Sequence, residues 1–194
     1  MSRFQPAITN DEINAMGKCV FPGVVEIIDT AEKAAAACAY LGGLDAVGFD
    51  TETRPSFKAG VTNRTALLQI SSRERCFLFR LSCMKLGRDV TRILENPAIA
   101  KIGAAVRDDI KGLQRLRPFR PQGFIDLQSI ACEWGIEEKS VRKLAGIVLG
   151  SSVSKAQRLS NWEATTLTAA QVSYAATDAW VCLRIYDTLM SEPK

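Results

Sequence analysis

Residues 46–52 read Ala-Val-Gly-Phe-Asp-Thr-Glu, an apolar strand that ends in two acids. Because side chains alternate across a strand, Asp50 and Glu52 share one face and the larger apolar side chains take the other. Two neighbouring carboxylates at the end of an apolar strand repel each other and resist dehydration unless a cation neutralises them. The stretch therefore indicates either a cation site at one end of a sheet, or a solvated strand end whose acids cap the next loop.

The rest of the chain predicts one α/β domain over residues 1–194, built around this strand. Strands are expected at 24–28, 46–52, 65–71, 75–81, 100–103 and 124–126, and helices at 9–16, 29–41, 86–95, 106–116, 127–134, 140–148 and 168–190. A polar loop is expected from Arg54 to Asn63. Three strands in close succession predict an antiparallel meander, and the later alternation of strands and helices predicts a mixed sheet covered by helices.

Two more acids lie on the apolar sides of predicted helices. At about 100° per residue, the apolar side chains of helix 106–116 form a narrow arc that contains Asp109 but not Asp108. In the last helix, Asp178 lies on the apolar side, with Tyr174 one turn earlier on the same side. Each alone has an ordinary explanation, such as a buried acid hydrogen-bonded to a core tyrosine. Three elements that each direct an acid inward favour a divalent-metal site.

Composition narrows the possible chemistry. The chain has no histidine, which excludes Ser-His-Asp triads, Cys-His pairs and His-ligated zinc. The six cysteines form no C-x-x-C pair and mostly have apolar neighbours, which favours buried reduced thiols over disulfides or a zinc site. No apolar run approaches the roughly 18 residues that span a bilayer, and the first residues lack the apolar core of a signal peptide. We therefore expect a cytoplasmic protein that does not associate with membranes.

Positive charge is unevenly distributed along the chain, whose net charge is +4. The segment 139–158 carries several lysines and arginines, and no acid lies between residue 139 and the acid at 163. Basic residues also outnumber acids over 101–120. Solvated surface is the ordinary explanation for such segments. A carboxylate cluster inside a basic protein nevertheless suits an anionic substrate held near metal ions.

Together these residues resemble the DEDDy family of 3′–5′ exonucleases, named for four acids and a tyrosine. The first motif is matched by Phe49-Asp50-Thr51-Glu52, and the second by residues 101–109, in which the motif aspartate aligns with Asp109. The third is matched by Leu159-Ser160-Asn161-Trp162-Glu163, followed by Tyr174-Ala175-Ala176-Thr177-Asp178-Ala179. The resemblance is strongest to the ribonuclease D group and the exonuclease domain of the Werner helicase, and it spans about residues 24–190.

The resemblance implies a ribonuclease H-like fold, with a five-stranded mixed sheet of three antiparallel strands, then parallel strands, flanked by helices. It implies a 3′–5′ exonuclease that hydrolyses DNA or RNA from the 3′ end and releases nucleoside 5′-monophosphates. Two divalent cations, Mg²⁺ or Mn²⁺, would be held by four acids: Asp50, Glu52, Asp109 and Asp178. Asp50 would bridge both ions and Asp109 would hold the second, while Tyr174 would orient the attacking water.

Substrate contacts are expected from the basic segment that leads into the Ser-Asn-Trp motif. Candidates for phosphate contacts are four basic residues: Lys155, Arg158, Arg142 and Lys143. Trp162 either stacks on a base or packs in the fold, and packing is the commoner role for a tryptophan in such a loop. Leu68 and its neighbours at 67 and 69 either line a pocket for the terminal nucleotide or fill the sheet.

Two other functions would use the same features. A nucleic-acid-binding module would keep the fold and lose turnover, which requires that no metal binds, and the intact acids argue against it. A metal-dependent phosphatase acting on small molecules would leave the basic segments and the Ser-Asn-Trp motif unexplained.

Overall fold

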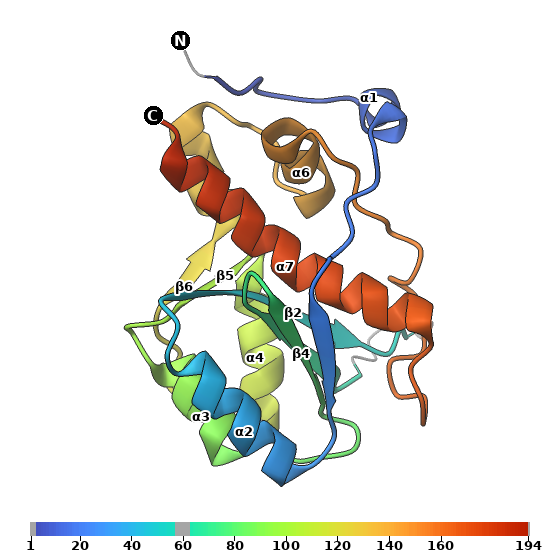
Figure 1. Ribbon diagram of the computed structural model, residues 1–194, viewed down its shortest axis with the longest axis vertical. Helices are drawn as coiled ribbons and strands as arrows, with labels where there is room; N and C mark the ends of the chain where they lie inside the picture. Colours follow the sequence, from blue (N-terminus) through green and yellow to red (C-terminus); the bar gives the residue numbers. More distant parts are fainter. Residues whose placement is uncertain (1–2, 57–62, 194) are drawn as a thin grey trace.

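A six-stranded sheet lies between two layers of helices in the computed structural model, which describes residues 3–56 and 63–193 (Figure 1). The strands are β1 (Val24–Ile28), β2 (Ala46–Thr53), β3 (Thr65–Ser71), β4 (Arg75–Arg80), β5 (Ala100–Gly103) and β6 (Phe124–Asp126). The helices are α1 (Asn10–Ala15), α2 (Ala31–Leu41), α3 (Arg88–Glu95), α4 (Val106–Leu116), α5 (Leu127–Ile130), α6 (Val141–Leu149) and α7 (Ala169–Ser191), with a 3-10 helix at Ala131–Trp134.

The number of strands implied by the resemblance was wrong, because the sheet has six strands and not five, as the six strand segments expected from the residues already indicated. Its order is β1-β4-β3-β2-β5-β6. Strands β2, β3 and β4 form the expected antiparallel meander, and β5 and β6 run parallel to β2. Strand β1, which lies at the residues expected from the sequence, pairs in parallel with β4 from Val24↔Arg75 to Ile28↔Phe79. It supplies partners for the backbone groups of β4, which would otherwise form an open sheet edge.

Most predicted elements are present, with ends that shift by one or two residues. Side-chain caps begin several helices, as in the capping box of Thr9 and Glu12 and the cap that Thr168 provides for α7. The helix predicted over 127–134 is wrong in type, because it divides into α5 and the 3-10 helix before Gly135, whose φ is +73°. The polar loop predicted from Arg54 to Asn63 extends over 57–62, which lie outside the described residues.

Each face of the sheet has its own hydrophobic core. Helix α7 crosses one face, with α6 packed on its outer side, and α2, α3 and α4 cover the other face (Figure 1). On β2, Val47 and Phe49 belong to the core beneath α2, α3 and α4, whereas Ala46 belongs to the core beneath α7. Because Asp50 and Glu52 continue the series of Ala46, they face α7.

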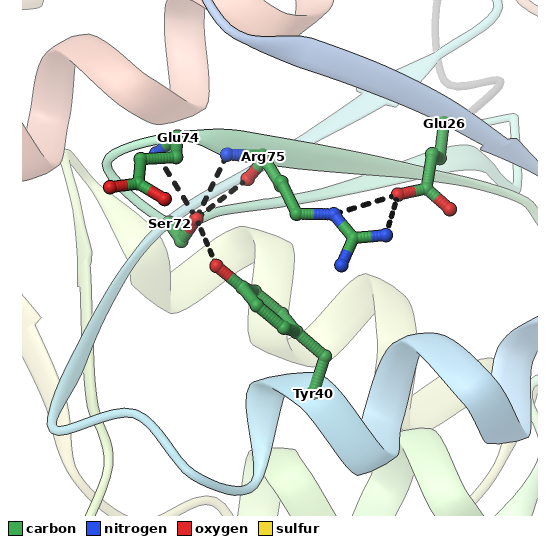
Figure 2. Close-up of polar contacts among 5 residues, drawn as sticks. All are labelled: Glu26, Tyr40, Ser72, Glu74 and Arg75. Atoms are coloured by element: carbon green, nitrogen blue, oxygen red, sulfur yellow. Dashed lines mark hydrogen bonds and ion pairs between the residues drawn. The ribbon is translucent and has the colours of Figure 1, made fainter.

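A polar network fixes the β3–β4 turn and the added edge strand (Figure 2). The hydroxyl of Ser72 accepts hydrogen bonds from the backbone N–H groups of Glu74 and Arg75 and lies 3.2 Å from the hydroxyl of Tyr40. The guanidinium of Arg75 stacks 4.7 Å from the Tyr40 ring centroid and pairs with Glu26 of β1. The network thereby ties α2 and β1 to the sheet, and it contains none of the predicted site residues.

Two expectations from composition concern membranes and cysteines. Within the described ranges, no helix is both long and apolar enough to cross a bilayer. All six cysteines are free thiols. The expected burial holds for Cys38, Cys76 and Cys182, whereas Cys83 and Cys132 are exposed.

Candidate active site

Three predicted acids meet where β2 ends beneath α7. Asp50 and Glu52 project from β2 and Asp178 projects from α7, and one carboxylate oxygen from each lies within 4.8 Å of the others. All three residues are partly exposed, so an ion or a substrate can reach them. The predicted convergence of these three acids is therefore confirmed.

Gly48 allows α7 to approach β2 closely enough for this cluster to form. A Cβ atom at position 48 would lie only 1.9 Å from the carbonyl oxygen of Ala179. Ala179 follows Asp178 on the helix, and Gly48 lies on the same face of β2 as Asp50. Contact between the two backbones thus sets the carboxylates side by side, and a larger residue at 48 would push the helix away.

The crowded acids hold protons more tightly than isolated acids do. Burial, followed by the charges of Asp178, Asp109 and Glu52, raises the pKa of Asp50 well above its ordinary value. Burial and the charges of Asp178 and Asp109 raise the pKa of Glu52 to about 8. Burial also raises the pKa of Asp178 to about 7, although hydrogen bonding with Tyr174 opposes the rise. Without a cation, the cluster is partly protonated at neutral pH.

Asp109 lies near this strand end but outside the group of three acids. Its carboxylate accepts a 2.5 Å hydrogen bond from Thr51, whose side chain points away from the face that carries Asp50. Burial raises the pKa of Asp109 to about 6. Asp108 is exposed and pairs with Lys111 at 2.9 Å. The prediction that Asp109 rather than Asp108 faces inward is confirmed, but the close convergence of four acids holds for only three of them.

The turn between β5 and α4 fixes the position of Asp109. Ala105 precedes α4 in the left-handed conformation (φ 57°, ψ 34°), which is costly for a residue other than glycine. Its N–H donates a 3.0 Å hydrogen bond to the carboxylate of Asp126, which also accepts one from the N–H of Gln128. This carboxylate thus holds the turn from which α4 directs Asp109 toward Thr51.

Tyr174 lies one turn before Asp178 and packs against Trp162, with 6.0 Å between the ring centroids. Burial, then the charges of Asp178 and Glu52, raises the pKa of Tyr174 above its ordinary value, so the hydroxyl keeps its proton at neutral pH. Trp162 has no exposed surface. The expectation that Trp162 stacks on a base is therefore wrong in this structure, and the alternative role, packing in the fold, is the one observed.

Leu68 is also fully buried, in the core beneath α2, α3 and α4. It faces away from α7 because its side chain points to the opposite face of the sheet from the acid cluster. A role for Leu68 in a terminal-nucleotide pocket is therefore contradicted, since the residue fills the sheet.

The loop that carries the Ser-Asn-Trp motif is attached to both α7 and the sheet. The side-chain amide of Gln171 donates a 3.2 Å hydrogen bond to the carbonyl of Asn161. The buried guanidinium of Arg80, at the end of β4, donates to the carbonyls of Ala164 and Thr165. These bonds hold the tryptophan in place behind Tyr174.

A cavity of about 150 Å³ connects the acid cluster with the basic segment. Asp50 and Asp178 line it together with three of the four basic candidates: Lys155, Arg158 and Arg142. Lys155 and Arg158 are exposed. Arg142 donates hydrogen bonds to two asparagine side chains of α1. The fourth candidate, Lys143, does not line the cavity and pairs with Glu138 at 2.5 Å.

A family model described as a 3′–5′ exonuclease matches residues 25–194. The chain belongs to the 3′–5′ exonuclease family. The mouse bifunctional 3′–5′ exonuclease/ATP-dependent helicase WRN is 36% identical over 151 residues, which make up 75% of this chain and 11% of that protein. The exonuclease 3′–5′ domain-containing protein 2 of Drosophila melanogaster is 36% identical over 148 residues, or 74% of this chain and 25% of that protein. The chain thus spans a quarter or less of these relatives.

Solved structures of exonucleases share the fold. The RNase D of Escherichia coli superposes with a TM-score of 0.78 at 25% identity, over 86% of this chain and 44% of that one. The Nibbler EXO domain of Aedes aegypti gives a TM-score of 0.76 over 86% and 87%. The predicted ribonuclease H-like fold of this family is therefore confirmed, with one additional strand.

Sequence reasoning missed three features of this candidate site. Gly48 could have been found, because a glycine inside an apolar strand often marks the close approach of another backbone. Thr51 could have been found from its place between the two acids on the opposite strand face. The third feature is the segment 17–21, which precedes the family match in the sequence and contributes residues to a cavity beside the site. This segment carries no recognisable motif.

The donor set suits a hard divalent cation. The cluster offers only carboxylate oxygens, which Mg²⁺ and Mn²⁺ prefer over softer ligands. A cation would also offset the burial and the mutual repulsion that together raise the pKa values of Asp50 and Glu52. The residues of this exonuclease-family site therefore fit a metal ion by both chemistry and charge.

Proposed function

We propose that the protein is a metal-dependent 3′–5′ exonuclease that hydrolyses DNA or RNA from the 3′ end and releases nucleoside 5′-monophosphates. The proposal depends chiefly on three carboxylates gathered within 4.8 Å, in a chain of the 3′–5′ exonuclease family. Tyr174 and the basic side chains that line the adjoining cavity support it, because the substrate is a polyanion.

Each acid has a proposed role toward two divalent cations, Mg²⁺ or Mn²⁺. Asp50 would contact both ions, Glu52 and Asp178 would complete the first site, and Asp109 would hold the second. Such a pair of ions stabilises charge on both the attacking and the departing oxygen of an in-line displacement. The separate position of Asp109, bonded to Thr51, is consistent with a ligand for a second and distinct ion.

The proposed role of Tyr174 is to orient the attacking water. Because its pKa is raised by burial and by the neighbouring acids, its hydroxyl remains a hydrogen-bonding group and does not act as a general base at neutral pH. The contact with the buried ring of Trp162 supports the position of the Tyr174 ring. Lys155, Arg158 and Arg142 are proposed to bind substrate phosphates, with Lys143 the weakest candidate of the four.

The function is tested with matched DNA and RNA oligonucleotides that carry a 5′ label, incubated with Mg²⁺ or Mn²⁺. A ladder that shortens from the 3′ end, with release of nucleoside 5′-monophosphates, is the expected result. A gel shift without cleavage would instead support the inactive nucleic-acid-binding module. Release of phosphate from small phosphomonoesters alone would support the phosphatase.

Tyr174→Phe is expected to lower kcat by about 10²-fold, because a misplaced nucleophile costs roughly that much, while KM stays nearly constant. Single-turnover and steady-state rates on one oligonucleotide measure both constants. Tyr186→Phe is the matched control, because Tyr186 lies on the same helix twelve residues later, roughly 18 Å away along its axis. An unchanged kcat in the Tyr174 variant would remove this hydroxyl from the chemistry.

Replacing both Lys155 and Arg158 by alanine is expected to weaken binding and to flatten its salt dependence. Each lost phosphate contact on a single strand reduces the slope of log K against log salt by about 0.7, so two contacts reduce it by about 1.4. Anisotropy titrations between low and moderate salt provide the slope. The control, Lys85→Ala with Arg88→Ala, removes the same charge near the start of α3, on the far face of the sheet. Equal slopes for wild type and the Lys155 and Arg158 variant would contradict the assignment.

A further inference from the structure

A second cavity, of about 220 Å³, adjoins the first, and Tyr174 and Asp178 line both. Cys19 and Val20 are among the residues that line it. These two residues belong to a segment that precedes the family match, which begins at residue 25. The segment therefore contributes a surface to the site that lies outside the family match.

The segment is held rigidly over α7. The N–H of Cys19 donates to the carbonyl of Ser152 at 2.8 Å, and the N–H of Ser152 donates to the carbonyl of Gly17 at 2.9 Å. The N–H of Phe21 donates to the hydroxyl of Thr177 at 3.1 Å. Figure 1 shows the chain passing from α1 across α7 into β1. The backbone on both sides of Val20 is thus fixed before any ligand arrives.

The two cavities differ in character. The first is lined by both acids and by basic side chains, whereas no basic side chain among the described residues lines the second, to which Val20, Ala156 and Ala170 add apolar surface of their own. Val20 is 53% exposed although its backbone is anchored, so a bulky apolar side chain is held open toward the solvent at the rim. An apolar cavity joined to a basic one matches a nucleotide, whose base has apolar faces and whose phosphate is charged.

We propose that this second cavity binds one nucleobase of the substrate strand, with Val20 as a contact that determines affinity for that base. The proposal rests on the exonuclease function proposed above. The base belongs to one of the two nucleotides that flank the scissile phosphate, because the cavity shares Tyr174 and Asp178 with the acid cluster. A volume below the roughly 300 Å³ of drug-sized ligand sites suits a single base.

Val20→Trp fills the cavity and is expected to raise the Kd for a single-stranded oligonucleotide about tenfold, a loss typical of one stacked base. Val24→Trp is the matched control, since Val24 is similarly exposed (60%) and lines neither cavity. Binding is measured by anisotropy in the absence of divalent metal, so that it does not depend on cleavage.

Oligonucleotides with an abasic site at the terminal or the penultimate position identify the bound base. Wild type is expected to bind one of them about tenfold more weakly than the intact strand. Val20→Ala should narrow that difference to about threefold, while Val24→Ala leaves it unchanged. The inference is overturned if wild type does not discriminate at either position, or if Val20→Trp weakens binding of abasic and intact strands equally. Discrimination without any cleavage in Mg²⁺ or Mn²⁺ would instead contradict the exonuclease function and leave the base site standing.

Discussion

Asp50→Asn is expected to reduce hydrolysis by at least about 10³-fold, while binding of nucleic acid persists. Removal of a single electrostatic stabiliser of a transition state costs roughly 10²- to 10³-fold, and Asp50 is the acid proposed to serve both cations. The substitution preserves the size of the side chain and removes its charge. Rates are measured on a 5′-labelled strand, and affinity is measured by anisotropy on the same strand.

Asp108→Asn is the matched control for this variant. Asp108 carries the same side chain as its neighbour Asp109, but it is exposed and pairs with Lys111, so activity is expected to stay within about twofold. Asp109→Asn, by contrast, is expected to lose most of the activity. Turnover in the Asp50 variant close to that of wild type would exclude the proposed mechanism, and equal losses from Asp108 and Asp109 would remove the distinction between them.

Local periodicity predicted correctly which side chains share a face. Strand alternation placed Asp50 and Glu52 together, and helical periodicity separated Asp109 from Asp108, because both rules depend only on neighbours in the sequence. The same rules do not say on which side of the sheet a helix packs. Asp109 therefore came to lie beside Thr51, outside the group of three acids but near enough for its charge to act on Asp50 and Glu52.

Features that depend on long-range packing could not be predicted. Pairing of β1 with β4 joins the first strand of the chain to the last strand of the meander, and the sequence pattern of β1 would fit an edge strand in several places. The burial of Trp162 depends on a loop that Arg80 and Gln171 hold from two other elements. The segment around Val20 reaches the site through its pairing with Ser152, for which neither segment carries a local signal.

The metal-free protein is expected to lose stability as the pH rises from about 4 to about 8, and Mg²⁺ is expected to restore it. In the folded state the pKa values are about 6 for Asp109, about 7 for Asp178 and about 8 for Glu52, with that of Asp50 also raised. In the unfolded chain these acids titrate near pH 4. Between those limits the folded state holds more protons than the unfolded state, so the free energy of unfolding falls as the pH rises.

The acids are partly solvated, which reduces the effect below the full value of about 1.4 kcal/mol per unit of pKa shift. We expect a loss of roughly 2 kcal/mol between pH 5 and pH 8, equivalent to about 4–8 °C in Tm for a domain of this size. Divalent metal binds the deprotonated acids, so it should raise Tm at pH 8 much more than at pH 5. Thermal melts with EDTA and with saturating Mg²⁺ at both pH values provide the four measurements.

Asp50→Asn separates the acid cluster from other titrating groups in the same experiment. Without metal, the variant is expected to melt above wild type at pH 8, because one of the crowded charges is gone, and its response to Mg²⁺ should largely disappear. Asp108→Asn should retain both the pH dependence and the response of wild type, since Asp108 lies outside the cluster. If EDTA-treated wild type melted at the same temperature at pH 5 and pH 8, the acids would not be crowded in solution, and the physical basis for cation binding would be lost.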